Sequence, residues 1–304
     1  MKTIHYKASG IAKQSELAIC LGFFDGLHIA HQTLMNKTIE EGKKRGLKTA
    51  MLTFSDHILS FLKKEPFSFI TSLKDKISAA RKLGFDFFYV LDVSEGLVQM
   101  EPSQFIDHFL KNQALVIVGF DFTFGNKGSG NATLLKQQTD FETIVIDEMD
   151  FEDEKIGTTR IRQCTKGGNM EEVAALMGKP YTIKGKVIPG KNRGKAMGFP
   201  TANIKNTGYL TPKQGVYIST VKIGKRRYKG IANVGKNPTF GDITESIEVY
   251  VMDFDGHLYG HTIELSFLHF IREEIKFNTV EDLIEKMKED EMVSRNYFNE
   301  RKII

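Results

Sequence analysis

The sequence predicts an α/β unit followed by a β unit that closes with a helix. In the first half, short apolar runs recur between stretches of helical periodicity, which favours strands that alternate with helices. In the second half, apolar and polar residues alternate in short runs separated by turn signals, which favours antiparallel strands. The chain of 304 residues has room for two domains of about 150 residues each.

The strands expected in the first half are apolar on both faces, which is typical of a parallel sheet covered by helices on each side. We expect strands at residues 17–21, 48–54, 85–93, 115–118 and 143–146, and helices at 31–45, 72–84, from 102 onward and 157–163. Ser72, with Asp75 three positions on, predicts a capping box at the start of the second helix. Ligands of such sheets bind beyond the carboxyl ends of the strands, so functional residues are expected there.

The second half predicts a small antiparallel barrel. Its strands are expected at residues 181–184, 216–221, 228–234 and 247–252, and a connecting helix at 171–177. Thr279 is the predicted cap of a final amphipathic helix, with Leu283, Ile284 and Met287 facing inward. These elements predict two domains, residues 1–178 and 179–304.

Composition excludes several classes of protein. Charged residues at 26% and hydrophobic residues at 41% are ordinary globular values, and no apolar run approaches the roughly 18 residues of a membrane span. The start of the chain lacks the apolar segment of a secretory signal, so a cytoplasmic location is expected. Cys20 and Cys164 are the only cysteines, which excludes a disulfide framework.

The charge balance favours small anionic substrates over nucleic acid. The net charge of +4 comes from 42 basic and 38 acidic residues, and nucleic-acid binders usually concentrate their basic residues on one face. We therefore expect small-molecule substrates and no membrane or nucleic-acid partner, and the sequence carries no indication of an oligomeric state.

The segment after the first strand is the best candidate for phosphate binding. Its glycines let the backbone approach a ligand, and the helix that follows offers free N–H groups to phosphate. His28 and His31 are three positions apart, so they share one face and can stabilise the charge that develops as pyrophosphate leaves. The alternatives are a chance pair of histidines or a metal site, although a third ligand at suitable spacing is missing.

Three segments together resemble the HxGH nucleotidyltransferases, in the form carried by bacterial FAD synthetases. They are residues 22–31, 118–125 and 156–162. The resemblance implies a Rossmann-like domain in which FMN attacks the α-phosphorus of ATP, with His28 and His31 stabilising the leaving pyrophosphate. It also implies ATP-binding residues at Gly22, Phe24, Asp25, Thr158, Thr159 and Arg160, and flavin-binding residues at Asp121 and Phe124. Hydroxyl and guanidinium groups suit phosphate oxygens as hydrogen-bond donors.

Two positions depart from the pattern of that family. Ala30 replaces the usual glycine between the histidines, where its methyl group would crowd the phosphates, and Gly157 supplies no hydroxyl. Thr158 and Thr159 keep two hydroxyls, so we expect activity to survive. The alternative is a kinase whose adenylyltransferase domain is weakened or inactive.

Residues 194–203 resemble the riboflavin kinase signature, in which Pro200-Thr201-Ala202-Asn203 follows a glycine-rich flap, and the likeness continues from about Tyr181 to Phe298. It implies that Glu248 is the general base for the ribityl hydroxyl and that Gly185 lies in the ATP flap. It further implies that Thr201 and Asn203 hold Mg²⁺, for which they are suitable hard oxygen ligands, and that Arg272 orders the flavin pocket. Without the motif, Glu248 would be read as an outward-facing strand carboxylate and Asn203 as a turn residue.

Together the two resemblances imply an enzyme of FAD biosynthesis. Riboflavin, FMN and FAD would be its substrates and products, ATP its co-substrate and Mg²⁺ its metal ion. Two further alternatives remain open from the residues: a flavin-sensing regulator that binds RNA, and an adenylyltransferase for another phosphate ester.

Overall fold

The computed structural model describes residues 1–7, 16–190, 194, 197–239 and 242–301. The chain divides into two compact units, Met1–Thr158 and Thr159–Ile304. This division falls earlier than the predicted boundary after residue 178, because helix α8 (Met170–Met177) packs on strands of the second unit. The boundary between functional domains stays a prediction.

The first unit contains a six-stranded sheet in the order β1-β4-β3-β2-β5-β8, and every pairing is parallel. The predicted parallel sheet is therefore confirmed. Its strands are β1 (Lys2–Tyr6), β2 (Leu17–Leu21), β3 (Lys48–Phe54), β4 (Phe87–Leu91), β5 (Leu115–Gly119) and β8 (Glu142–Ile146). Two short hairpins accompany it, β6 (Thr123–Phe124) with β7 (Gly130–Asn131), and β9 (Asp150–Phe151) with β10 (Glu154–Lys155).

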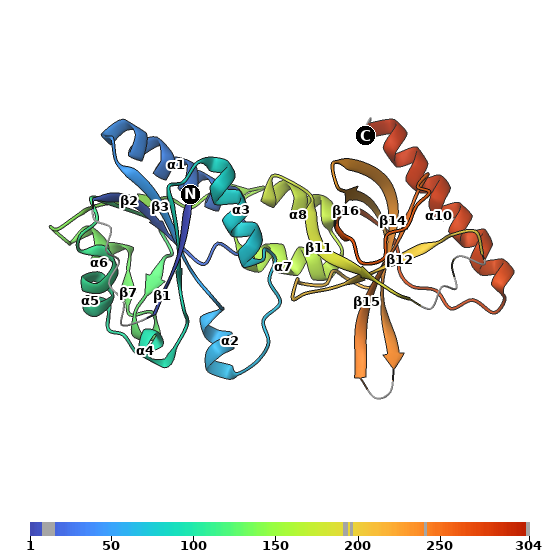
Figure 1. Ribbon diagram of the computed structural model, residues 1–304, viewed down its shortest axis with the longest axis horizontal. Helices are drawn as coiled ribbons and strands as arrows, with labels where there is room; N and C mark the ends of the chain where they lie inside the picture. Colours follow the sequence, from blue (N-terminus) through green and yellow to red (C-terminus); the bar gives the residue numbers. More distant parts are fainter. Residues whose placement is uncertain (8–15, 191–193, 195–196, 240–241, 302–304) are drawn as a thin grey trace. The chain divides into compact units, whose positions relative to one another are not determined.

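Helices cover both faces of this sheet (Figure 1). Alternate residues of each strand point to opposite faces, so Ala18 and Cys20 pack under one helical layer and Leu17 and Ile19 under the other. The first layer is α1 (Ile29–Arg45) and α3 (Leu73–Leu83), and the second is α4 (Glu95–Val98), α5 (Pro102–Phe105), the π-helical turn Ile106–Leu110 and α6 (Ala132–Lys136). Burial on both sides explains why the strands are apolar throughout.

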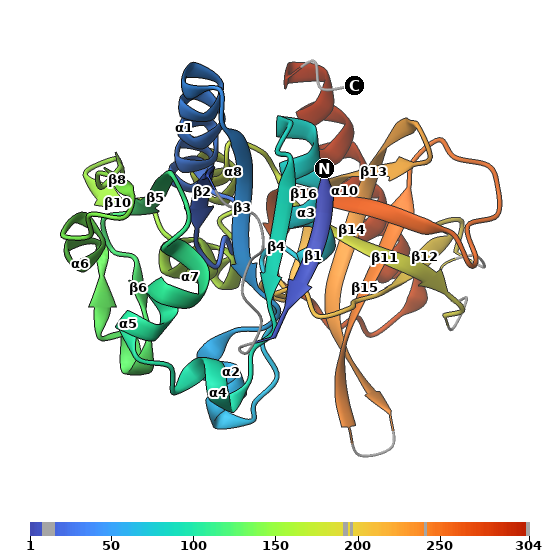
Figure 2. The ribbon, with the colours of Figure 1, turned by 60° about the vertical axis from the view of Figure 1, so that its left-hand side comes forward.

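Some local expectations are confirmed in detail and others were missed. The Ser72 hydroxyl caps α3 by accepting from the Asp75 N–H, which confirms Ser72 as the cap of this helix. Strand β1 was not predicted because it is a half-exposed edge strand that pairs only with β4 (Figure 2). The short helix α2 (Ile58–Lys63) was also missed, since it buries no residue that would mark a periodic face.

The order of the strands in the first unit predicts a ligand site at the carboxyl end of β2. Strand β2 has β3 on one side and β5 on the other, so the winding of the sheet reverses there. Open α/β sheets bind ligands at the carboxyl ends of the strands at such a reversal. The loop from β2 to α1, which carries His28, leaves the sheet at this point.

The second unit is a closed antiparallel barrel in the order β11-β12-β15-β14-β13-β16, so the predicted barrel is confirmed. Its strands are β11 (Tyr181–Ile188), β12 (Thr201–Lys205), β13 (Gly215–Ile223), β14 (Arg226–Thr239), β15 (Asp242–Val251) and β16 (Thr262–Arg272), and α7 (Thr158–Gly167) and α8 precede them. Strands β14 and β15 extend beyond the barrel as a long hairpin (Figure 1).

The final helix, α10 (Val280–Arg301), packs on the barrel through Phe298, which contacts Ile218 and Leu268. The Asp282 N–H donates to the Thr279 hydroxyl at 3.1 Å, which confirms the predicted cap. Among the helices in the described ranges, none is long and apolar enough to cross a bilayer. The cytoplasmic location stays a prediction.

Candidate active sites

His28 and His31 lie stacked at the amino terminus of α1. His28 is the N-cap residue, and its Nδ1 accepts a hydrogen bond from the His31 backbone N–H at 3.4 Å. The two ring centroids are 3.6 Å apart with an angle of 20° between the planes. Because Nδ1 of His28 is an acceptor, the neutral ring carries its proton on Nε2 and can donate it to a ligand.

Both histidines are held in the neutral form. Burial lowers the pKa of His28 to about 4, with Lys155 acting in the same direction and Asp121 opposing it. Burial also lowers the pKa of His31, and the neighbouring His28 and the ammonium of Lys76 add to the effect. At neutral pH the pair therefore offers hydrogen-bond donors to a phosphate chain and no net charge.

The loop before the histidines is held in a tight conformation. Phe24 and Leu27 have φ values of 56° and 46°, in the left-handed region that non-glycine residues rarely adopt. The buried Phe24 ring lies 5.2 Å from the His31 ring, and a Cβ at Gly22 would come within 3.1 Å of it. Strain of this kind persists only where the surrounding structure enforces it, and it is common at ligand sites.

Asp25 fixes this loop from within. Its carboxylate is 1% exposed and accepts from the Ile70 and Thr71 N–H groups at 2.8 and 3.0 Å. Its backbone carbonyl accepts from the Thr158 hydroxyl at 3.1 Å. The structure thus brings Thr158 to the double-histidine loop, and the Asp25 carboxylate binds backbone groups of its own unit.

Thr159 and Arg160, also predicted to bind ATP, follow Thr158 in the chain and belong to the second unit. Thr159 is exposed, whereas the Arg160 guanidinium pairs with Glu172 of α8 at 2.7 Å. The Glu172 partner was not foreseen from the sequence.

The two predicted flavin-binding residues have different surroundings. Asp121 is exposed, pairs with Lys155 at 2.7 Å and acts electrostatically on His28. Phe124 is only 4% exposed, and its ring packs against Phe105 and Phe122 in the core. Asp121 is therefore accessible to a ligand near His28, whereas the Phe124 side chain belongs to the hydrophobic core.

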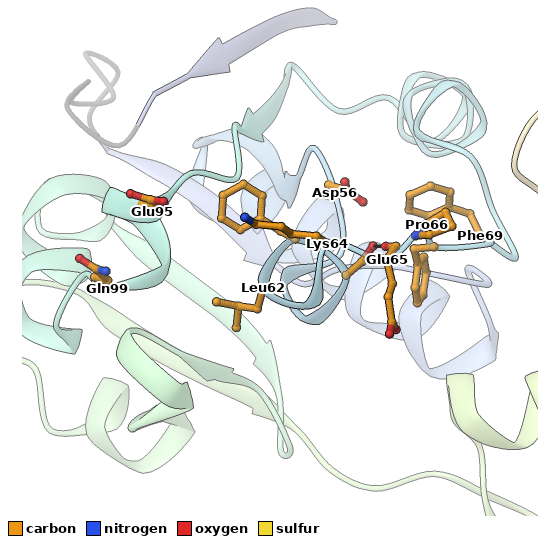
Figure 3. Close-up of a pocket in the computed structure, with 11 residues that line it drawn as sticks. Asp56, Leu62, Lys64, Glu65, Pro66, Phe69, Glu95 and Gln99 are labelled. Carbon is orange, nitrogen blue, oxygen red and sulfur yellow. Dashed lines mark hydrogen bonds between the residues drawn. The ribbon is translucent and has the colours of Figure 1, made fainter.

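The first unit also contains a pocket of about 740 Å³ that the sequence did not predict (Figure 3). In Figure 3, Glu95 and Gln99 lie on one side, Pro66 and Phe69 on the other, and Leu62 and Lys64 of the α2 segment between them. The full lining is Asp56, Ser60, Phe61, Leu62, Lys64, Glu65, Pro66, Phe67, Phe69, Glu95 and Gln99.

Aromatic rings connect this pocket to the double-histidine loop. Phe67 stacks on His57 with ring centroids 4.1 Å apart, and Phe23 contacts both rings edge-on. Phe23 belongs to the loop that carries His28. The run of phenylalanines at 61, 67 and 69 was the sequence signal that could have indicated this pocket.

In the second unit, the predicted kinase residues lie on one face of two paired strands. Asn203 of β12 lies opposite Glu248 of β15, and Thr201 lies opposite Tyr250. All four are partly exposed, whereas the alternate residues between them fill the barrel core. The Glu248 carboxylate faces outward from the barrel, as expected for an ordinary strand carboxylate, but it also lines a pocket.

That pocket has a volume of about 580 Å³. The Thr201 hydroxyl donates to Glu248 Oε2 at 3.1 Å inside it. The described lining residues are Gly194, Met197, Phe199, Thr201, Val216, Ile231, Asn233, Glu248, Tyr250, Arg272, Glu274, Ile275, Lys276, Phe277, Leu283, Met287 and Asp290. Helix α10 thus contributes a wall through Leu283 and Met287, two of the residues predicted to face inward.

Glycines bring the flap backbone directly onto the predicted metal-binding side chains. A Cβ at Gly190 would overlap the Asn203 carboxamide, and one at Gly194 would overlap the Phe199 carbonyl and approach Thr201 Oγ1 to 3.5 Å. Gly185 lies in β11 against Ile204 with equally little room for a side chain. Lys195 and Ala196 of the predicted signature lie outside the described residues.

Arg272 lines the same pocket and is held there by a buried ion pair. Its Nε and Nη2 donate to the Asp290 carboxylate of α10 at 3.0 and 2.7 Å, and Nη1 donates to the Glu273 carbonyl. The side chains of Arg272 and Asp290 are 16% and 6% exposed. Asp290 was missed because nothing in its local sequence distinguishes it from the other acids of the helix.

The first unit carries paired imidazoles where the winding of its parallel sheet reverses. The second unit is a barrel in which the Thr201 hydroxyl and the Glu248 carboxylate pair beside glycine-rich backbone. These features are typical of the class of nucleotide-dependent transferases, with one site in each unit. The family model described as FAD synthetase matches residues 10–160, and the one described as Riboflavin kinase matches residues 177–298. The chain belongs to the family of bifunctional riboflavin kinase/FMN adenylyltransferases.

Relatives of that description cover nearly the whole chain. The relative from Listeria monocytogenes is 39% identical over 92% of both chains, and that from Bacillus subtilis is 35% identical over 98% of this chain and 99% of its own. A crystal structure from Streptococcus pneumoniae, described as a macrolide-efflux protein, has a TM-score of 0.89 and 32% identity, covering 97% of this chain and 99% of that one.

Proposed function

We propose that this chain makes FAD from riboflavin in two ATP-dependent steps. The barrel unit phosphorylates riboflavin to FMN, and the parallel-sheet unit joins FMN to AMP from a second ATP. The observation that carries the proposal is the match of both halves to flavin-enzyme families in relatives of the same length. Macrolide efflux, the description of the pneumococcal structure, is not carried over because the family models and the curated relatives agree on flavin chemistry.

In the kinase step, Glu248 takes the proton from the ribityl 5′-hydroxyl. The oxygen then attacks the γ-phosphorus of ATP, the bond to the β-phosphate oxygen breaks, and ADP leaves. The hydrogen bond from Thr201 orients the Glu248 carboxylate toward the pocket. Arg272, held by Asp290, keeps the pocket wall in place for the flavin.

The oxygen atoms of Thr201, which lines this pocket, and of Asn203, which lies opposite Glu248 on the paired strand, suit Mg²⁺ as ligands. Thr201 donates its own proton to Glu248, so its oxygen lone pairs stay available, and the Asn203 carboxamide lies against the flap backbone. These two side chains would hold the ion, which neutralises phosphate charge when bound. No cluster of three or more His, Cys, Asp or Glu side chains in the described ranges offers a different metal site.

In the adenylylation step, an FMN phosphate oxygen attacks the α-phosphorus of ATP. The bond to the bridging oxygen breaks and pyrophosphate leaves, so no protein nucleophile is needed. His28 and His31 donate hydrogen bonds to the departing group from neutral rings. Gly22, Phe24 and Asp25 shape the loop that receives the nucleotide.

The flavin ring of FMN has a candidate position in the first unit. The pocket of Figure 3 offers Phe67 and Phe69, whose rings contact each other edge-on, and a flat heteroaromatic ring can lie against such aromatic side chains. Its link to the loop through Phe23 would bring the FMN phosphate toward the histidines. Asp121, which acts on His28, then faces the ribityl side of the site.

The test is a chromatographic time course with riboflavin, ATP and Mg²⁺. We expect the wild type to make FMN and then FAD. Glu248→Ala should leave riboflavin untouched yet convert supplied FMN to FAD, and the His28→Ala, His31→Ala double variant should stop at FMN. Wild-type protein that leaves riboflavin unchanged would contradict the kinase assignment, and FMN without FAD would contradict the adenylyltransferase assignment.

A further inference from the structure

A buried lysine lies beneath the double-histidine loop and has no part in the steps derived so far. Lys76 of α3 is 1% exposed. Its Nζ donates to the Phe23 carbonyl at 2.5 Å and lies 4.0 Å from the centroid of the Phe23 ring. The buried carboxylate of Asp25 acts electrostatically on this ammonium, and the groups that contact it directly are the carbonyl and the ring of Phe23.

The position of Lys76 makes it part of the support for the loop. The Phe23 carbonyl accepts a second hydrogen bond from the Thr53 hydroxyl at 3.1 Å. Two residues further on, the Asp25 carboxylate binds the backbone just before α3. Lys76 and the backbone just before α3 thus hold the loop at Phe23 and at Asp25. These two residues flank Phe24, whose backbone has a positive φ.

A charge in this position is costly without an anionic ligand. An ammonium removed from water needs a counter-charge, and the Asp25 carboxylate, the Phe23 carbonyl and the Phe23 ring supply only part of what water provided. Burial lowers the pKa of Lys76 to about 8, and the Asp25 carboxylate opposes this effect. Lys76 is therefore mostly protonated at pH 7 and releases its proton a little above neutrality.

The field of this ammonium reaches the histidines. Lys76 is one of the groups that lower the pKa of His31, and Asp25 and His31 are the titratable groups that interact with it. Since both histidines are neutral, they contribute no charge of their own. Lys155, the other cation near His28, is exposed and already paired with Asp121.

We propose that Lys76 is a positioning residue of the adenylyltransferase site, which holds the Phe23 carbonyl and supplies the positive potential that favours the triphosphate at the neutral histidine pair. The inference rests on the proposed function of the first unit. The negative charge of bound ATP then offsets the cost of burying the Lys76 ammonium. Lys76 therefore favours the binding of a polyanionic ligand.

The experiment measures FAD formation from FMN, in the full-length chain without riboflavin, between pH 7.5 and 9.5. The variants are Lys76→Met, Lys76→Arg and, as a matched control on the exposed side of the same helix, Lys74→Met. The KM for ATP and kcat are determined separately at each pH. Urea unfolding of the same preparations reports whether the first unit, which contains Lys76, is folded.

In the wild type we expect the KM for ATP to rise as pH passes about 8, with a smaller change in kcat. Lys76→Arg should keep a low KM across the range because a guanidinium stays charged. Lys76→Met should raise the KM about tenfold at pH 7.5 and abolish its pH dependence. Lys74→Met should match the wild type.

A role in folding alone predicts a different pattern. The arginine and methionine variants would then be impaired alike, and the wild-type KM would be the same at both ends of the pH range. Either result overturns the inference. A wild type that forms no FAD at all contradicts the proposed function instead, so the two failures are distinguishable.

Discussion

The Thr201 hydroxyl donates a 3.1 Å hydrogen bond to the Glu248 carboxylate across strands β12 and β15. Asn203, two residues along β12, lies directly opposite Glu248 in the register. The period of two in a strand therefore places the proposed base and both proposed metal-binding side chains on one outer face of the barrel. Two paired strands thus bring together the proposed base and the proposed metal-binding side chains.

Replacing Thr201 should show how much the reaction depends on the orientation of Glu248, because Glu248 itself stays in place. Thr201→Val keeps the shape of the side chain and removes both the hydrogen bond to Glu248 and an oxygen ligand. We expect riboflavin phosphorylation to fall about 100-fold in kcat, while FAD formation from supplied FMN is unchanged. Thr201→Ser, which keeps the hydroxyl, should retain most of the activity. Equal rates for the valine and serine variants would contradict the assigned role.

The ion pair between Arg272 and Asp290 should be essential to the docking of α10. Asp290→Leu leaves a buried guanidinium without its partner, which typically costs about 3–5 kcal/mol of unfolding free energy. We expect the double variant Arg272→Met, Asp290→Leu to recover much of that loss, because no uncompensated charge remains. Urea unfolding of the wild type and the two variants tests this, and a double variant as unstable as the single one would exclude an ion-pair origin.

The site residues that could be predicted from the sequence are those that lie in a segment with a clear apolar–polar periodicity. Thr201, Asn203 and Glu248 lie on alternating strands, so their shared face follows from periodicity and pairing. Asp290 and Lys76 could not be identified this way. Each sits on an amphipathic helix among similar charged residues, and only the tertiary fold determines which of them is buried.

The strands show the same limit. Strands β2, β4 and β5 were predictable because burial on both faces makes them apolar throughout. Strand β1 buries only part of each residue, and its identity as a strand depends on its pairing with β4. The Figure 3 pocket likewise depends on the way α2 and α4 come together, which no local pattern encodes.

The neutral His28 should make the protein sensitive to acid. Its pKa of about 4 in the folded state lies below the ordinary 6.5, so the unfolded chain binds a proton first as the pH falls. The stability that His28 contributes is complete above pH 6.5 and is lost toward pH 4, a difference of about 2–3 kcal/mol. We expect His28→Asn to lose less unfolding free energy than the wild type between pH 7 and 4.5.

Urea unfolding at the two pH values measures this difference. His5→Asn is the matched control, because the His5 side chain is 55% exposed whereas that of His28 is buried. If His28→Asn loses as much stability as the wild type on acidification, the buried neutral ring is not the source of the acid sensitivity.

A substitution in the Figure 3 pocket should change the KM for FMN and leave the KM for ATP unchanged. Phe67→Ala removes the ring that stacks on His57 and lines the pocket. We expect the KM for FMN in FAD formation to rise about tenfold, in line with the loss of one aromatic stacking partner, with the KM for ATP unchanged. Leu59→Ala, on the exposed side of α2 and outside the pocket lining, serves as the comparison. An unchanged KM for FMN would place the flavin ring elsewhere.

Ala30 should be tolerated at the adenylyltransferase site. Helix α1 begins at Ile29, so positions 28 and 31 share a face, and position 30 points about 130° away from the middle of that face at 100° per residue. The methyl group is thus directed away from the stacked imidazoles, and the crowding expected from the sequence does not follow from the helix geometry.

We therefore expect Ala30→Gly to change the rate of FAD formation from FMN by less than about threefold, which corresponds to well under 1 kcal/mol in the barrier. The glycine should instead destabilise the first turn of α1 by about 0.5–1 kcal/mol, because it has more backbone freedom in the unfolded chain. Steady-state rates and urea unfolding on the same preparations separate the two effects. A gain of tenfold or more in FAD formation would mean that the methyl group does obstruct the phosphates, and that the natural chain is a kinase with a restrained adenylyltransferase.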